Sequence, residues 1–574
     1  MGAVAVASAC SSGQPSAACS PLSVLVVAAP QIAPAVANSA RNFNSTHPKP
    51  GGYCVTVNVK QADPAQEASS LSGQGVIAAP ASPDAWIPDS TLWVDQARVT
   101  AAGAGRVAAT GQSMAISPVV LALPRTVARQ LAAIVRTPGW KMLTPTSLPT
   151  NAPADGSPAT QITGAGSSAG ALQLKVLDPA RNAAGMASLL AMRSVAGHGP
   201  TGLVTFVTVA RVAQFLAVPD NKALFKAILS ASQPTGGLTS EQAVWAHNNT
   251  DASHPVNAVY LSEGSPMLDF PYVMTTKDSA KRLALADFAR AMRAPVGQQA
   301  IQSQGLRTPD GAAMFGFGPS SGVATEPPAA LPMPGVTIVD AVSQMWARIL
   351  IGVRMLIVLD ESPSMGNLVE GANITRLQAI QQLSVQGISL FNKNDVIGLW
   401  TFDTGLADPF NYRVVLPMRP LNQPVTVPSG TGSTTKATQR QLLLGAMAAQ
   451  RPQVDTVTAL YATIRSAYRE VSRGYIPDRF NGVIVDTDGT NYDPRPHSLS
   501  LDQLLATLRS EFNPQRPVNI IVIGYGHHFD LPSMTKVADV TNGAVYDATS
   551  PAGIEKFYLQ MLTRLVCNNN CPLP

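Results

Sequence analysis

The chain has 574 residues, of which 45% are hydrophobic and only 13% are charged, and its formal net charge is +5. This length exceeds one ordinary hydrophobic core and predicts two to four domains. The sequence has no run of five or more Lys or Arg and no stretch of about 18 uncharged apolar residues, so neither a nucleic-acid-binding patch nor a membrane-spanning helix is expected.

The N-terminus is small and apolar, and Cys10 follows the run Ala7-Ser8-Ala9. This order resembles the end of a bacterial lipoprotein signal, although the basic start and most of the apolar region of a signal peptide are missing. The resemblance implies that Cys10 carries lipid and that residues 1–19 are a signal remnant and tether. The alternative is an Ala/Ser-rich terminus without a signal. The excess of Ala, Val, Thr and Pro is typical of a high-GC, actinobacterial-like genome.

Cysteine usage favours an exported protein, because disulfides persist outside the cytoplasm. Beside Cys10 there are four cysteines, at positions Cys19, Cys54, Cys567 and Cys571. Cys19 precedes an expected strand at 22–28 and Cys54 opens another at 54–59, so a disulfide between them is expected if the strands are neighbours. The two C-terminal cysteines, in a tail at 567–574, are expected to close a small loop. A metal site is not expected there, because no second Cys or His cluster accompanies them.

The N-terminal half reads as alternating strands and helices, starting with the strand at 22–28, a helix at 32–43 and an alternating strand at 55–59. Three further motifs follow in the chain: Pro-Asp-Ala-Trp-Ile-Pro-Asp-Ser at 83–90, Ser-Pro-Val-Val-Leu-Ala-Leu-Pro at 117–124 and Gly-Leu-Arg-Thr-Pro-Asp-Gly at 305–311. Together they resemble the bacterial extracellular solute-binding proteins of the periplasmic-binding-protein class. The resemblance implies a two-lobed α/β domain over 20–310, with residues 117–124 crossing into the second lobe and a small-molecule ligand in a cleft that closes by hinge bending.

The resemblance also implies a ligand cleft formed by Asp84, Trp86, Ser117, Trp140 and Asp269. Each of these residues has a second interpretation. Large aromatic residues more often pack than bind ligands, and an Asp near a proline is a common turn residue.

Residues 311–338 are rich in Pro, Gly, Ala and Ser, which is typical of a linker. A helical pattern at 339–351 then leads into an apolar strand that ends at Asp360. This strand is followed by Glu361-Ser362-Pro363-Ser364, so one carboxylate and two hydroxyls lie within five residues. In open α/β sheets the carboxyl ends of strands are where ligands bind, and small hard cations prefer such oxygen ligands.

Two further oxygen donors follow in the expected pattern. Thr458 lies at the start of a helix that runs to about 471, and Asp488 follows an apolar strand at 483–485 in the triplet Thr487-Asp488-Gly489. This order resembles the von Willebrand factor A (VWA) domain, over 339–566, with Pro363 in a position where that family usually has Gly. The resemblance implies a doubly wound, Rossmann-like sheet and a metal-ion-dependent adhesion site (MIDAS). Its ligands would be Asp360, Ser362, Ser364, Thr458 and Asp488, and its ion Mg²⁺, with Mn²⁺ or Ca²⁺ as alternatives.

Catalytic chemistry is not expected. Residues 166–170 match the Gly-x-Ser-x-Gly pattern of hydrolases around Ser168, but no strand precedes them as a nucleophile elbow requires. We therefore expect a binding protein, lipid-anchored on the outer face of the cell membrane or secreted, whose metal captures an Asp or Glu carboxylate of a partner protein. The alternative is a solute receptor for import or sensing that uses the VWA domain for docking.

Overall fold

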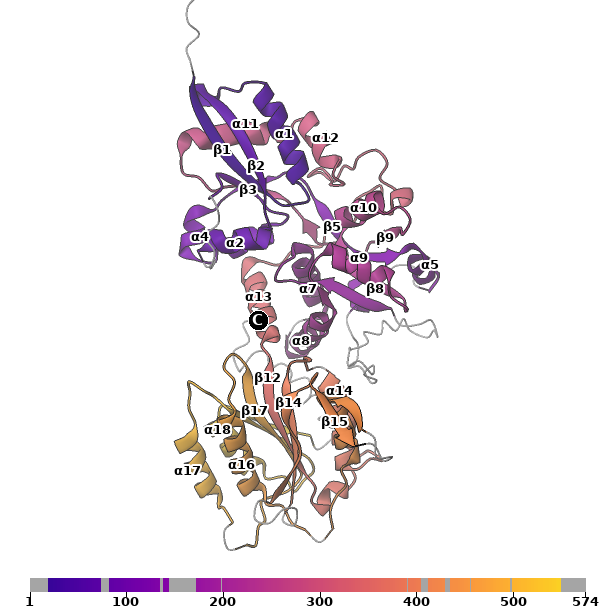
Figure 1. Cartoon of the computed structure of the whole chain (residues 1–574), viewed down its shortest axis with the longest axis vertical. Coiled ribbons are helices and arrows are strands. Elements are labelled where there is room, and N and C mark those ends of the chain that lie inside the picture. Colours follow the sequence, from indigo (N-terminus) through magenta and orange to yellow (C-terminus); the bar gives the residue numbers. More distant parts are fainter. Residues whose placement is uncertain are drawn as a thin grey trace, which may run out of the picture.

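A computed structural model gives the structure of the protein. It describes residues 19–73, 82–134, 138–143, 172–197, 199–389, 391–403, 411–428, 434–454, 456–495 and 498–548. Three large sheets organise this part of the chain, two in the N-terminal half and one in the C-terminal half (Figure 1).

The first lobe is built on a mixed five-stranded sheet in the order β2-β1-β3-β11-β4. β1 and β2 pair in parallel, because a helix connects them, and both begin near the disulfide between Cys19 and Cys54. The sequence prediction of this disulfide is confirmed. The strands are β1 (Ser20–Ala28), β2 (Tyr53–Gln61), β3 (Ala85–Ile87), β4 (Ala108–Ser113) and β11 (Pro271–Met274), and the helices are α1 (Ala33–Ser45), α2 (Pro64–Ser72), α3 (Thr91–Arg98), α4 (Ala101–Arg106), α11 (Ser279–Arg293) and α12 (Pro295–Gln302).

The second lobe has a six-stranded sheet in the order β10-β5-β8-β6-β7, with β9 also paired to β5. Its strands are β5 (Ser117–Pro124), β6 (Gln173–Leu177), β7 (Ala217–Val218), β8 (Thr235–Ser240), β9 (Val256–Val259) and β10 (Met267–Leu268). Its helices are α5 (Arg125–Ile134), α6 (Trp140–Leu143), α7 (Ala183–Val195), α8 (Gly199–Leu216), α9 (Asn221–Leu229) and α10 (Glu241–Thr250).

The chain crosses between the two lobes at two adjacent places. β4 leads into β5, and β10 returns to β11. The two crossings are joined where the amide of Met114 donates to the carbonyl of Phe270 at 3.0 Å. The predicted crossover strand at 117–124 therefore matches β5, and the predicted two-lobed α/β architecture is confirmed.

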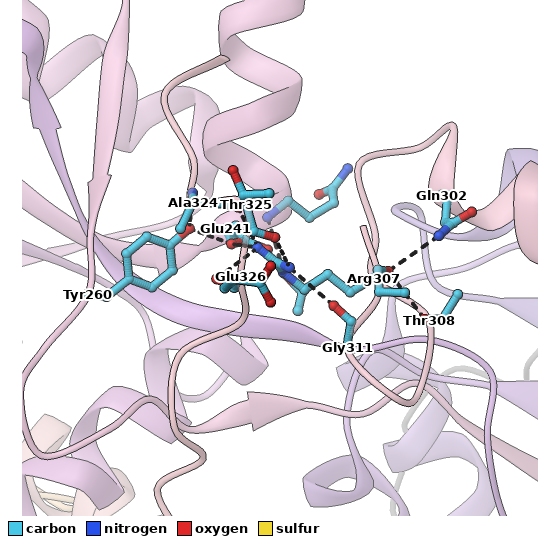
Figure 2. A network of polar contacts seen from close by, with 12 residues as sticks. Glu241, Tyr260, Gln302, Arg307, Thr308, Gly311, Ala324, Thr325 and Glu326 are labelled. Carbon is cyan, nitrogen blue, oxygen red and sulfur yellow. Dashed lines mark hydrogen bonds and ion pairs between the residues drawn. The ribbon is translucent and has the colours of Figure 1, made fainter. Parts of the chain in front are cut away.

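The segment after residue 307 is packed against the second lobe and is not a free spacer. Figure 2 shows its anchor, the buried guanidinium of Arg307, which pairs with Glu241 at 2.7 Å and donates to the carbonyl oxygens of Ala324 and Thr325. Tyr260 donates to the same carboxylate and accepts from the amide of Ala324. A buried Arg–Glu pair is tolerated when its remaining hydrogen-bonding groups are satisfied. Here the hydrogen bonds from Arg307 to backbone carbonyl oxygens also fix the path of residues 311–326.

Helix α13 (Val336–Leu350) lies between the two-lobed unit and the C-terminal sheet (Figure 1). It packs against α3 of the first lobe and against α7 and α8 of the second. Its buried Trp346 donates from Nε1 to Asp178 Oδ1 at 3.2 Å, directly after β6. From α8, the buried Arg211 donates to the carbonyl oxygen of Ile349 at 3.2 Å.

The C-terminal unit is a six-stranded sheet in the order β14-β13-β12-β17-β18-β19. All neighbours pair in parallel except β14, which is antiparallel at one edge. Numbered within this unit the order is 3-2-1-4-5-6, that of a doubly wound fold, so this predicted fold class is also confirmed. Its strands are β12 (Val353–Asp360), β13 (Val396–Phe402), β14 (Tyr412–Pro420), β17 (Phe480–Thr487), β18 (Asn519–Gly524) and β19 (Ala544–Asp547), with a separate hairpin of β15 (Pro424–Pro428) and β16 (Thr434–Thr438).

In the described part of this unit, five helices cover the sheet on both faces: α14 (Arg376–Ser389), α15 (Gln439–Ala449), α16 (Leu460–Arg473), α17 (Leu501–Glu511) and α18 (Leu531–Val540). Alternate residues of β12 belong to different cores. Leu356 and Val358 cluster with residues of α16 and α17, whereas Met355 and Ile357 cluster with residues of α14 and α15. This explains why β12 is apolar from Met355 to Leu359, directly before Asp360. Within the described ranges, no helix is both long and apolar enough to cross a membrane.

Candidate metal site and solute cleft

Asp360 is the last residue of β12, and its side chain is fully buried at the carboxyl edge of the C-terminal sheet. Its Oδ1 accepts from the amide of Ser362 at 2.8 Å, and its Oδ2 accepts from the hydroxyl of Thr487 at 2.6 Å. Burial raises the pKa of Asp360 to about 7; the hydrogen bonds from Ser362 and Thr487 oppose this, and the charge of Asp488 adds to it. The carboxylate is thus oriented by two donors.

A chain of hydrogen bonds links the other motif residues. The hydroxyls of Ser362 and Ser364 are 3.2 Å apart, and Ser364 donates to Asp488 Oδ1 at 2.7 Å. Asp488 immediately follows β17, the parallel neighbour of β12, so both carboxylates lie at the same edge of the sheet. Four residues predicted as metal ligands are therefore close together, although they come from segments more than a hundred residues apart.

Thr458 lies beside this group. A Cβ atom on Gly489 would be 3.4 Å from its hydroxyl oxygen, and Gly489 directly follows Asp488. The carbonyl oxygen of Thr458 accepts from the amide of Tyr492 at 2.9 Å, and Asn491 Oδ1 accepts from the amide of Tyr461 at 2.9 Å. The loop after β17 is thereby fastened to the start of α16, which places Thr458 next to Asp488.

The donor set suits a small, hard cation, because it consists of oxygen atoms only. It contains two carboxylates and three hydroxyls. Among the residues that the structure describes, no group of three or more His, Cys, Asp or Glu has the arrangement of a metal site. This candidate site therefore depends on its hydroxyl groups and carries less negative charge than a carboxylate-rich cation site.

Three polar residues around the site were missed in the sequence. Thr487 stands next to Asp488 in the quoted triplet, but its bond to Asp360 depends on the pairing of β17 with β12. Glu361 is fully buried and pairs with Arg413 at 3.3 Å, and burial raises its pKa while the charge of Arg413 opposes the rise. Arg376, from the start of α14, forms an ion pair with Asp488 Oδ2. One feature of the sequence could have indicated Arg376. A cation at a helix N-terminus is disfavoured by the helix dipole, so its presence there suggests a nearby acidic partner.

The residues predicted for the solute cleft make contacts in the first lobe, in the second lobe and at the crossover between them. Asp84 accepts from the amide of Leu25 at 3.0 Å and pairs with Lys281 at 2.9 Å. Trp86 is fully buried in β3. The hydroxyl of Ser117 accepts from the amide of Gln242 at 3.1 Å.

The last two residues predicted for the cleft are held in a similar way. Trp140 is fully buried and donates from Nε1 to the carbonyl oxygen of Gly264 at 2.9 Å. Asp269 lies between β10 and β11 and accepts from the amide of Thr91 at 2.7 Å, at the start of α3. Asp269 therefore joins the crossover to a helix of the first lobe. A role for these five residues in solute binding stays a prediction.

Several other predicted features lie outside the described residues: the lipidation site Cys10, the pair Cys567 and Cys571, and the hydrolase-like pattern around Ser168. His527, which follows β18, is exposed and its Nε2 lies 2.7 Å from Glu370 Oε2.

The comparison with protein families agrees with the architecture of the N-terminal unit. Residues 24–307 match the family of bacterial extracellular solute-binding proteins. The match ends at Arg307, so the anchored segment and α13 lie beyond the matched region.

A relative that spans both units is the uncharacterized protein Rv1836c of Mycobacterium tuberculosis strain H37Rv. It is 25% identical over 548 residues, which cover 92% of this chain and 74% of the relative. Among solved structures, the periplasmic thiamin binding protein has a TM-score of 0.39 at 14% identity, covering 57% of this chain and 94% of that chain. The von Willebrand factor type A protein from Catenulispora acidiphila has a TM-score of 0.27 at 17% identity, covering 38% of this chain and 43% of that chain. With TM-scores this low, the fold assignment rests on the sheet orders and connections described above.

Proposed function

We propose that the chain is an extracytoplasmic binding protein whose C-terminal unit captures an acidic group of a partner protein through a bound divalent cation. The observation that supports this most strongly is the hydrogen-bonded group of Asp360, Ser362, Ser364 and Asp488, with Thr458 beside it, at the carboxyl edge of a doubly wound sheet. Ligands of open α/β sheets bind at this edge.

In this proposal the two carboxylates and the three hydroxyls hold the ion, and Mg²⁺ is the first candidate because it prefers oxygen ligands and retains water. A carboxylate of the partner would take the place of a water on the ion. The bond to the partner would then be charge-assisted and dependent on the metal.

The location of the protein outside the cytoplasm is supported by the family match of residues 24–307 and by the disulfide between Cys19 and Cys54. Lipid attachment at Cys10, or secretion, belongs to the same proposal.

The proposal is tested by measuring water proton relaxation with Mn²⁺ bound to the full-length protein. A peptide with a single Asp should lower the relaxation enhancement, because its carboxylate replaces a metal-bound water. The matched peptide with Asn in place of Asp should leave it unchanged. Equal effects of the two peptides, or no effect of either while Mn²⁺ stays bound, would contradict carboxylate capture.

A second candidate function is a solute receptor for import or sensing, with the C-terminal unit as its docking domain. It is supported by the family match over the two-lobed unit. Native mass spectrometry of the full-length protein, purified without denaturation, should then show a bound small molecule that is lost on unfolding. Repeated preparations from the native host with no such mass would argue against this function.

A further inference from the structure

Arg376 contacts the candidate metal site but is a cation, so it cannot belong to the set of oxygen donors. It is the first residue of α14, after Thr375, whose hydroxyl accepts from the amide of Gln378 at 3.1 Å as a helix cap does. The helix dipole disfavours a cation in this position. The placement is compensated by an ion pair, because Arg376 Nη1 binds Asp488 Oδ2.

The guanidinium is held closely in this place. The side chain of Arg376 is only 11% exposed, and that of Asp488 is fully buried. Arg376 Nη1 also lies 3.5 Å from the carbonyl oxygen of Ser364. On the other side is Gly526, which has a φ of 79° and follows β18; any side chain there would overlap the guanidinium. The backbone therefore leaves room for Arg376 over the edge of the site.

The ion pair occupies an oxygen atom of a carboxylate that the proposed metal needs. Asp488 Oδ1 accepts from Ser364, and its Oδ2 is engaged by Arg376. With Asp360 and Asp488 as the two acidic groups of the donor set, one positive side chain offsets half of their formal charge. A divalent cation that binds both carboxylates meets this charge at close range.

We propose that Arg376 is a built-in counter-cation that a divalent metal ion must displace from Asp488. This inference rests on the metal site of the proposed function and adds its regulation. Metal binding becomes an exchange of one cation for another, so the affinity is set by the difference between two electrostatic interactions. The site would load only at high free concentrations of the divalent ion and release it readily.

The test is a titration of the full-length protein with Mn²⁺, in which free Mn²⁺ is measured by electron paramagnetic resonance. Arg376→Gln removes the competing charge but keeps a polar side chain, and it should tighten Mn²⁺ binding by about tenfold or more. Arg376→Lys keeps the charge and should stay closer to the wild type. Arg469→Gln is the matched control, because it removes an arginine that pairs with Glu511 between α16 and α17, and it should leave the affinity unchanged.

The outcomes separate this inference from the proposed function on which it rests. If the wild type binds Mn²⁺ and Arg376→Gln binds it equally or more weakly, the inference is overturned and the metal site stands. If only Arg376→Gln binds within the measured range, the inference is supported in its strongest form. If neither binds while circular dichroism shows both to be folded, the metal site and the inference both fail.

Discussion

The two acidic side chains at the edge of the C-terminal sheet are fixed by different partners. Asp360 is held by donors from its own loop and from β17, whereas Asp488 is held by Ser364 and Arg376. Each carboxylate is thus oriented in part by a group outside the expected ligand set, Thr487 for Asp360 and Arg376 for Asp488. Such supporting groups commonly determine how well a metal site binds.

Thr487→Val should weaken metal binding without disturbing the fold. Valine has nearly the shape of threonine, but it cannot donate to Asp360 Oδ2, which Thr487 does at 2.6 Å. Loss of such a supporting hydrogen bond costs about tenfold in metal affinity or more. A Mn²⁺ titration of Thr487→Val, beside Thr487→Ser as the variant that keeps the hydroxyl, measures this effect. Equal affinities of the two variants would show that the hydrogen bond has no role in binding.

Because of Asp89 in the first lobe, we expect the free energy of unfolding to depend on pH. It is buried and accepts from Trp93 Nε1 at 2.8 Å, and burial raises its pKa to about 7, with smaller contributions from the charges of Asp63 and Asp269. Since the pKa is higher in the folded state than in the unfolded state, the folded protein holds an extra proton between about pH 4 and pH 7. The contribution of Asp89 to the free energy of unfolding therefore falls as pH rises through this window.

Asp89→Asn should remove this dependence and keep an acceptor for Trp93. Relative to the variant, the wild type should lose about 2–3 kcal/mol of unfolding free energy between pH 5 and pH 8. Urea unfolding of both proteins at the two pH values measures the difference. If the unfolding free energies of the two proteins differ by the same amount at pH 5 and pH 8, the raised pKa of Asp89 is refuted.

At the scale of elements, the central strands and the helices between them were predictable. β5, β12, β17 and β18 are apolar runs buried on both faces, and such runs are visible in a sequence. β14 and the hairpin of β15 and β16 were not predicted, because their side chains are largely exposed or half-buried and several prolines interrupt them. The four motif residues that meet at the sheet edge were found because they follow strand ends. The contacts of the predicted cleft residues could not be predicted, because their partners, such as Lys281 for Asp84, lie far away in the sequence.

Helix α13 is the element that joins the two units, and Trp346 is its main buried contact. Trp346→Ala should lower the free energy of unfolding by about 3–5 kcal/mol, as expected for loss of a large buried aromatic side chain. Trp346→Phe loses the bond to Asp178 but keeps most of the packing, so its cost should be about 1–2 kcal/mol. Val336→Ala, at an exposed position of the same helix, is the control and should change stability by less than about 0.5 kcal/mol.

Urea unfolding of the full-length protein provides the measurement. A small effect of Trp346→Ala, similar to that of Val336→Ala, would mean that α13 is not held by its contacts with the lobes.

At the scale of the whole molecule, the candidate metal site lies at the end of the C-terminal sheet that is remote from the solute-binding region. β12 starts at Val353, three residues after α13 ends at Leu350, and its eight residues reach about 25 Å to Asp360. Figure 1 shows the sheet extending from α13 away from both lobes. In the proposed function, a protein partner at the metal site would therefore approach without contacting the two lobes.

The most direct test of the central claim is calorimetric titration of Mg²⁺ into the full-length protein beside Asp360→Asn. The wild type should bind one Mg²⁺, and Asp360→Asn should not bind, because it lacks one of the two carboxylates of the donor set. Asp502→Asn, which removes an exposed carboxylate at the start of α17, should bind as the wild type does. Equal Mg²⁺ binding by the wild type and by a folded Asp360→Asn variant, or no Mg²⁺ binding by either the wild type or Arg376→Gln, would contradict the claim.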